Sequence, residues 1–65
     1  MRLIVNGEEH DVAADDLRGL LEALDLNPRK VAVELNLEIV PRSLYAQTAL
    51  ADGDHIEIVH FIGGG

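Results

Sequence analysis

Only one segment of this sequence has the spacing of a long amphipathic helix, and this limits the folds open to the chain. Between residues 15 and 26, leucines at i, i+3, i+4 and i+7 form one apolar stripe, made of Leu17, Leu20, Leu21 and Leu24. We expect Asp15 to cap this helix and Asn27-Pro28 to end it. With 65 residues and no cysteine, the chain has one small core and no disulfide to support it. The single stripe must therefore cover one face of a sheet.

The apolar residues before the helix predict a hairpin. The run Leu3–Val5 is followed by Asn6-Gly7, a hairpin signal because both residues tolerate positive φ. Residues 8–13 are mostly polar and predict a returning edge strand, with Val12 turned toward the core.

The residues after the helix predict three more strands. Residues 31–35 and 38–40 alternate around Asn36-Leu37, a turn in which a leucine at positive φ would be strained. Ser43 is expected to cap a short helical turn. Residues 55–62 are the most apolar strand, which we place centrally beside the first one. The prediction is one α+β domain over residues 1–65, with a mixed sheet of four to five strands packed on one main helix.

The charge balance excludes several classes of function. Twelve acidic residues against five basic ones give a formal net charge of -7, which would repel nucleic acid and anionic membranes. No run of about 20 apolar residues could span a bilayer. Residues 1–7 reach polar positions too early for a signal peptide. We therefore expect a cytoplasmic protein whose partners present basic surface to it.

The sequence ends in Gly63, Gly64 and Gly65, and two interpretations of this run are open. It is either a frayed terminus or a reactive tail, with residues 62–65 flexible. An extended glycine strip has no side chains, so it can enter a channel too narrow for other residues. A partner enzyme could then activate the terminal carboxylate by adenylation, after which a sulfur nucleophile displaces AMP.

Other candidate sites are weaker. The three histidines do not suggest a metal site, because His55 and His60 point to opposite faces of one strand and His10 lies on another. Val59 and Phe61 alternate with the core residues of the last strand. Together with Ile4, they are expected to form an apolar docking patch away from the helix.

Several motifs together resemble a known family. They are the segment 31–36 (Val-Ala-Val-Glu-Leu-Asn), the element 39–43 (Ile-Val-Pro-Arg-Ser), the run from Asp52-Gly53-Asp54 to Phe61, and the terminal glycines. At this spacing and length the whole chain resembles the ThiS family of β-grasp (ubiquitin-like) sulfur carriers of thiamin biosynthesis. Leu37 departs from the family pattern, which usually has glycine in this turn.

The resemblance implies a carrier that is not itself an enzyme and binds no cofactor. An E1-like adenylating enzyme would use ATP and magnesium to activate the carboxylate of Gly65. Sulfur from cysteine, delivered through a cysteine desulfurase persulfide, would convert it to a thiocarboxylate (1-thioglycine). Thiazole synthase would then take the sulfur for thiazole phosphate formation. Gly63 and Gly64 would enter the partners' active sites.

Two alternatives share the fold and the glycine end. One is a sulfur carrier like the small subunit of molybdopterin synthase, which is usually longer and less well matched by Val-Pro-Arg-Ser. The other is a ubiquitin-like modifier, whose tail forms amide bonds with lysines. The chemistry of a modifier would be the same up to the adenylate, and only the nucleophile would differ. The two sulfur carriers would differ in the protein that accepts the sulfur, which is thiazole synthase or the large subunit of molybdopterin synthase.

Overall fold

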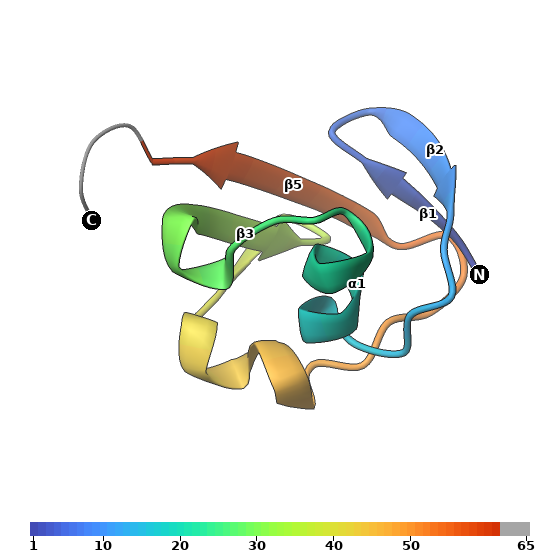
Figure 1. Cartoon of the computed structure of the whole chain (residues 1–65). Helices are drawn as coiled ribbons and strands as arrows, with labels where there is room; N and C mark the ends of the chain where they lie inside the picture. Colours follow the sequence, from blue (N-terminus) through green and yellow to red (C-terminus); the bar gives the residue numbers. More distant parts are fainter. Residues whose placement is uncertain (62–65) are drawn as a thin grey trace.

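The chain forms a five-stranded mixed sheet with its helices on one side (Figure 1). The computed structural model describes residues 1–61. The elements are β1 Arg2–Val5, β2 Glu8–Asp11, α1 Leu17–Ala23, the 3-10 helix η1 Pro28–Lys30, β3 Val31–Leu35, β4 Glu38–Val40, the 3-10 helix η2 Arg42–Gln47 and β5 His55–His60. The strand order is β2-β1-β5-β3-β4, and only the β1–β5 pair is parallel. This confirms a mixed sheet with β5 in the centre beside β1 and the polar β2 at an edge.

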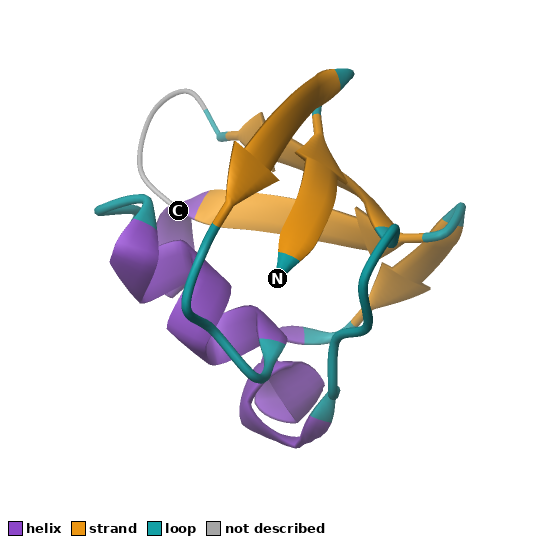
Figure 2. Cartoon of the chain, turned by 90° about the vertical axis from the view of Figure 1, so that its right-hand side faces the viewer, coloured by secondary structure: helices purple, strands orange, loops and turns teal. Residues whose placement is uncertain are grey.

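The core lies between the sheet and the helices, which Figure 2 shows on one side of the strands. The buried residues are apolar apart from the hydroxyl of one tyrosine: Leu3, Val5, Ala14, Leu17, Leu20, Leu21, Val31, Val33, Tyr45, Leu50, Ile56 and Ile58. Three of the four stripe leucines belong to this set, and Leu24 and Val12 pack against it half-buried. The helix stripe therefore covers the sheet as predicted. No helix within residues 1–61 is long and apolar enough to cross a membrane.

Helix α1 is shorter than the leucine spacing suggests, and both of its ends differ from the prediction. The residue that caps it is Asp16, whose Oδ1 accepts from the Gly19 N–H at 2.7 Å, so the prediction of Asp15 was wrong by one residue. At the other end Asp25 has φ 58°, and its N–H donates to the Glu22 carbonyl while the Leu26 N–H donates to the Leu21 carbonyl. This pair of bonds is a Schellman motif. It ends the helix before Asn27-Pro28 is reached.

Both hairpin turns have the predicted left-handed backbone. Asn6 and Gly7 have φ of 50° and 83°, and Asn36 and Leu37 have φ of 51° and 73°. Leu37 is thus the strained residue that the sequence predicts, in a region that non-glycine residues rarely occupy. Its side chain is 88% exposed, so packing offers it little compensation.

The Asn6 side chain joins β1 to β5 beyond the last paired residues of the two strands. Its Oδ1 accepts from the Ile58 N–H at 2.7 Å and its Nδ2 donates to the Ile58 carbonyl at 3.1 Å. Without these bonds, two part-buried backbone groups of the central strand would lose their partners. The side-chain amide of Asn6 therefore makes the two hydrogen bonds that a further paired residue of β1 would otherwise make with β5.

The segment between β4 and β5 differs from the prediction in one detail. Helix η2 begins at Arg42 after Pro41 and has no side-chain cap, so Ser43 does not cap it. Proline at this point already has the extended backbone that precedes a helix, with φ -60° and ψ 143°. Leu50, which follows η2, is buried in the core.

Candidate functional site

The predicted reactive residues Gly63, Gly64 and Gly65 lie outside the described residues. The structure does describe the strand that leads to them. β5 lies between β1 and β3; its first two residues, His55 and Ile56, pair with β1, and residues 56–60 pair with β3. The described chain ends at Phe61, whose N–H donates to the Lys30 carbonyl at 2.9 Å. The approach to the glycine run is therefore held by the most central strand of the sheet.

Val59 and Phe61 lie on the sheet face away from the helices, as the alternation predicts. Ile56 and Ile58 are buried on the side of the sheet that the helices cover (Figure 2), whereas 61% of Val59 and 53% of Phe61 remain exposed. Because the Val59 and Phe61 side chains are exposed, they add little to the packing of the core. These two residues therefore stay candidates for contact with a partner.

Ile4 lies on the same face but at the other end of β5. It pairs with His55, which is four residues from Val59, or about 13 Å at the rise of a strand. The charged residue Glu57 lies between them on the outer face. Ile4 is half-buried. The predicted patch therefore does not form a continuous surface that includes Ile4.

The neighbours of Val59 come instead from β3 and β4. Ala32 is the register partner of Val59. Ile39, which is 77% exposed, pairs with Glu34, two residues further along β3 on the same face. A shallow groove of about 210 Å³ opens beside these residues and is lined by Pro28, Val31, Ala32, Val33, Ile39, Val40, Arg42, Tyr45 and Phe61. We call it the apolar groove. Phe61, the last described residue, is part of its lining.

The histidines stay apart. The register places His55 opposite Ile4 on the outer face and His60 opposite Val31, whose side chain is buried on the inner face. His10 pairs with Leu3 at the edge of the sheet, with Glu8 as a neighbour at 4.0 Å. Among residues 1–61, no group of three potential metal ligands converges.

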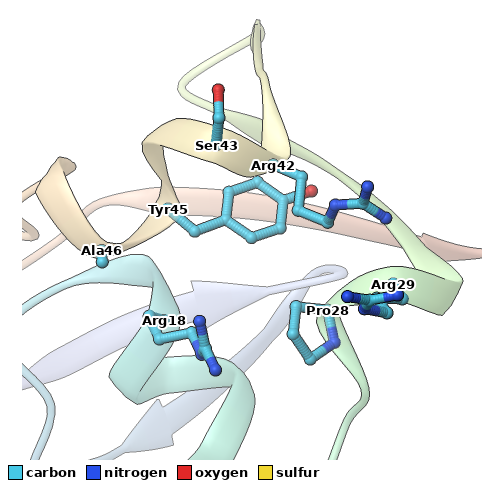
Figure 3. A pocket seen from close by; sticks show the side chains of 7 residues that line it. All are labelled: Arg18, Pro28, Arg29, Arg42, Ser43, Tyr45 and Ala46. Atoms are coloured by element: carbon cyan, nitrogen blue, oxygen red, sulfur yellow. The ribbon is translucent and has the colours of Figure 1, made fainter.

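A second hollow contains most of the positive charge of the domain. It has a volume of about 320 Å³ and is lined by Arg18, Pro28, Arg29, Arg42, Ser43, Tyr45 and Ala46. We call it the arginine pocket. Figure 3 shows Arg18 coming from α1, Arg29 from η1 and Arg42 from η2, around the ring of Tyr45, while the Ser43 hydroxyl points away. Three separate elements thus bring three of the five basic residues together.

Tyr45 connects the pocket to the core. Only 2% of its surface is exposed, and its burial raises the pKa of the phenol above the ordinary value, with the Arg42 charge acting in the opposite direction. The tyrosine therefore stays neutral in the physiological range. It supplies an aromatic wall and a hydroxyl between the arginine pocket and the apolar groove, both of which it lines.

Sequence reasoning missed two parts of this region. Ile39 and Ala32 line the apolar groove because of the strand register around Asn36-Leu37. The two-residue alternation along these strands could have predicted that register. The arginine pocket had no such signal. Its charged residues are 11 and 13 positions apart along the chain, and only the tertiary arrangement of α1, η1 and η2 places them around one pocket (Figure 3).

Comparison with known proteins places the chain in a family. The ThiS family model matches residues 3–65. Over the whole chain, the sequence is 58% identical to a thiazole synthase of Paramagnetospirillum magneticum and spans 20% of that protein's length. It is also 36% identical to the sulfur carrier protein ThiS of Escherichia coli, with both chains covered completely.

A solved structure gives the same result for the fold. The thiamine biosynthesis protein ThiS of Geobacter metallireducens superposes with a TM-score of 0.83 at 39% identity, and the match covers 100% of both chains. The β-grasp architecture expected from the sequence is thereby confirmed. The family match over residues 3–65 and the full-length similarity to two ThiS proteins agree, and the chain belongs to the ThiS family.

Proposed function

We propose that this chain is a sulfur carrier of thiamin biosynthesis, in which the Gly65 carboxylate is the group that carries sulfur. The observation that carries the proposal is the family match, which extends through the glycine run to residue 65. The geometry of the preceding residues supports it, because the central strand β5 leads from the core to the glycines past an exposed apolar groove.

The chemistry needs two partner-catalysed steps. A carboxylate is a poor electrophile, so an E1-like enzyme with ATP and magnesium would first join Gly65 to AMP and release pyrophosphate. In the second step, the terminal sulfur of a desulfurase persulfide, which originates from cysteine, would form the carbon–sulfur bond as the bond to AMP breaks. A thiol would then cleave the sulfur–sulfur bond of the resulting acyl disulfide, which frees the thiocarboxylate and leaves a disulfide. The carrier contributes a slender tail and a docking surface, and the partners contribute the cleft and the catalytic groups.

Thiazole synthase is the proposed acceptor of this sulfur. In Paramagnetospirillum magneticum, a protein named thiazole synthase contains a stretch that is 58% identical to the present chain. The presence of a similar domain in the same polypeptide as a synthase supports a shared reaction sequence, since covalent linkage keeps the two parts at high effective concentration.

Intact-mass measurement tests the carrier function. The protein is incubated with ATP, the adenylating enzyme of the same organism and a cysteine-derived sulfur source. We expect a mass gain equal to the replacement of one oxygen by one sulfur. A variant lacking Gly65 is the control, which should keep its circular dichroism spectrum but gain no sulfur. An unchanged mass of the full chain, or lysine-linked adducts on other proteins, would contradict the proposal.

Docking through the apolar groove has its own test. The exposed half of Phe61 is available to a partner, so Phe61→Ala should weaken binding to the adenylating enzyme more than it lowers the free energy of unfolding. Leu37→Ala is the matched control, because Leu37 is an exposed apolar residue at the far end of β3. A large loss of stability in Phe61→Ala with unchanged affinity would assign Phe61 to the core instead.

A further inference from the structure

The arginine pocket concentrates positive charge in a domain whose formal net charge is -7. No carboxylate lines it. Arg18 has an exposed ion pair with Glu22 at 3.6 Å, whereas Arg29 and Arg42 have no ion-pair partner among the described residues. Three guanidinium groups of like charge repel one another, so an anionic group entering the pocket would be favoured electrostatically.

The position of the pocket ties it to the docking surface. Pro28, Arg42 and Tyr45 line both the arginine pocket and the apolar groove. The two hollows are therefore neighbours, one apolar and one basic, beside the end of the described chain at Phe61. Protein–protein interfaces commonly have an apolar centre and a polar rim, and they are enriched in arginine.

Helix η1 offers no free backbone N–H to an anion in the pocket. Phosphate sites commonly use free N–H groups at the start of a helix. Helix η1 starts at Pro28, which has no N–H, and the Arg29 N–H already donates to Asn27 Oδ1 at 2.9 Å. The side-chain donors are guanidinium groups, which bind carboxylates and phosphates alike in a bidentate manner. The apolar groove next to them suits a protein partner, whose anionic groups are carboxylates.

We propose that the arginine pocket receives an acidic segment of the protein that binds the apolar groove, with Arg29 and Arg42 as its main contacts. The identity of that protein as the adenylating enzyme rests on the proposed function. The acidic surface elsewhere on this domain repels such a segment, so the pocket fixes the orientation of the complex as well as adding affinity. The partner thus presents acidic residues at this end of the carrier, in addition to any basic surface that it presents elsewhere.

Single charge-removing variants test the contact. Arg42→Gln is compared with Arg2→Gln, which removes the same charge from an exposed arginine paired with Glu9 at 3.0 Å on β1–β2. At low salt we expect Arg42→Gln to weaken binding to the adenylating enzyme by about fivefold and to reduce its salt dependence. Arg2→Gln should stay within about twofold of the unmodified protein. Equal effects of the two variants would overturn the proposal for the arginine pocket. The sulfur-carrier function would not be contradicted by that result, because sulfur loading is measured separately.

A second measurement is independent of the adenylating enzyme. Hexaglutamate is titrated into the 65-residue protein at low salt, and the arginine Nε–Hε resonances are followed by NMR. We expect shifts at Arg29 and Arg42 and none at Arg2, and no such shifts with hexalysine. If inorganic phosphate saturates the same resonances at a lower concentration than the peptide, the pocket is a small-anion site and the proposal is wrong. Absence of shifts with hexaglutamate would also overturn it, whether or not the protein accepts sulfur.

Discussion

Replacement of Asn6 by glycine isolates the two side-chain hydrogen bonds that hold β5 beyond the end of β1. Glycine keeps the backbone conformation, because Asn6 has φ 50° and glycine adopts positive φ without strain. What the Asn6→Gly variant loses is the acceptor for the Ile58 N–H at 2.7 Å and the donor to the Ile58 carbonyl at 3.1 Å. Both lost bonds belong to the strand that carries Val59 and leads to Phe61.

The expected loss of stability follows from these two bonds. Each hydrogen bond contributes about 0.5–1.5 kcal/mol net, and more where a buried partner is left unsatisfied. The added freedom of glycine in the unfolded chain costs about a further 0.5–1 kcal/mol. Asn6→Gly should therefore lower the free energy of unfolding by about 2–3 kcal/mol. For a chain of 65 residues, whose total stability is about 3–10 kcal/mol, this is a large share.

Urea unfolding followed by circular dichroism measures this loss, and Asn36→Gly provides the matched control. Asn36 has φ 51° and also makes two side-chain bonds, to the His55 N–H and to Asp54 Oδ1, but these groups are exposed. Water can replace exposed bonds, so we expect a smaller loss of about 1–2 kcal/mol. Amide exchange at Ile58 should rise in Asn6→Gly and not in Asn36→Gly. Equal losses in the two variants, or a loss below about 0.5 kcal/mol in Asn6→Gly, would refute the reasoning.

Three further changes test separate features of the fold. Leu37→Gly should raise the urea midpoint by relieving backbone strain of about 1–3 kcal/mol at φ 73°, and a lower midpoint would show that the leucine makes a needed contact. Gly19→Ala should stabilise α1 by about 0.5–1 kcal/mol, because the new Cβ would lie 3.4 Å from Asp16 Oδ1, an ordinary contact; destabilisation would mean that the cap is displaced. Burial raises the pKa of Tyr45, while the Arg42 charge acts in the opposite direction. This tyrosine should therefore leave the free energy of unfolding unchanged below about pH 10 and lower it above, because the phenol ionises first in the unfolded chain. Ultraviolet titration of this single tyrosine and comparison with Tyr45→Phe check the effect, and a phenol titrating at or below the ordinary pKa would contradict it.

Much of the fold could be predicted because its signals are local. The leucine spacing requires one helix on one sheet face, and Asn6-Gly7 and Asn36-Leu37 have the left-handed backbone expected of two-residue hairpins. The prediction of the helix cap failed because two neighbouring residues could fill the same position. Asp15 and Asp16 are equally suitable caps by type, and only the backbone leading out of the sheet places Asp16 within reach of the Gly19 N–H.

The candidate site could also be predicted only in part. Alternation along one strand was sufficient to place Val59 and Phe61 on the open face, since side-chain direction depends only on the strand itself. It was insufficient for Ile4, because position along the neighbouring strand depends on the parallel β1–β5 register, which pairs Ile4 with His55.

The sequence by itself determined the glycine run, the central apolar strand before it and the family motifs, because each is a contiguous pattern. Only the tertiary structure decided that Arg18, Arg29 and Arg42 meet beside the apolar groove. Their encounter depends on how three helical segments pack under one sheet. A net charge of -7 predicts partners with basic surface, but net charge carries no information on where the few positive groups gather. The folded chain places three of its five basic residues in one pocket, next to the groove that Phe61 lines.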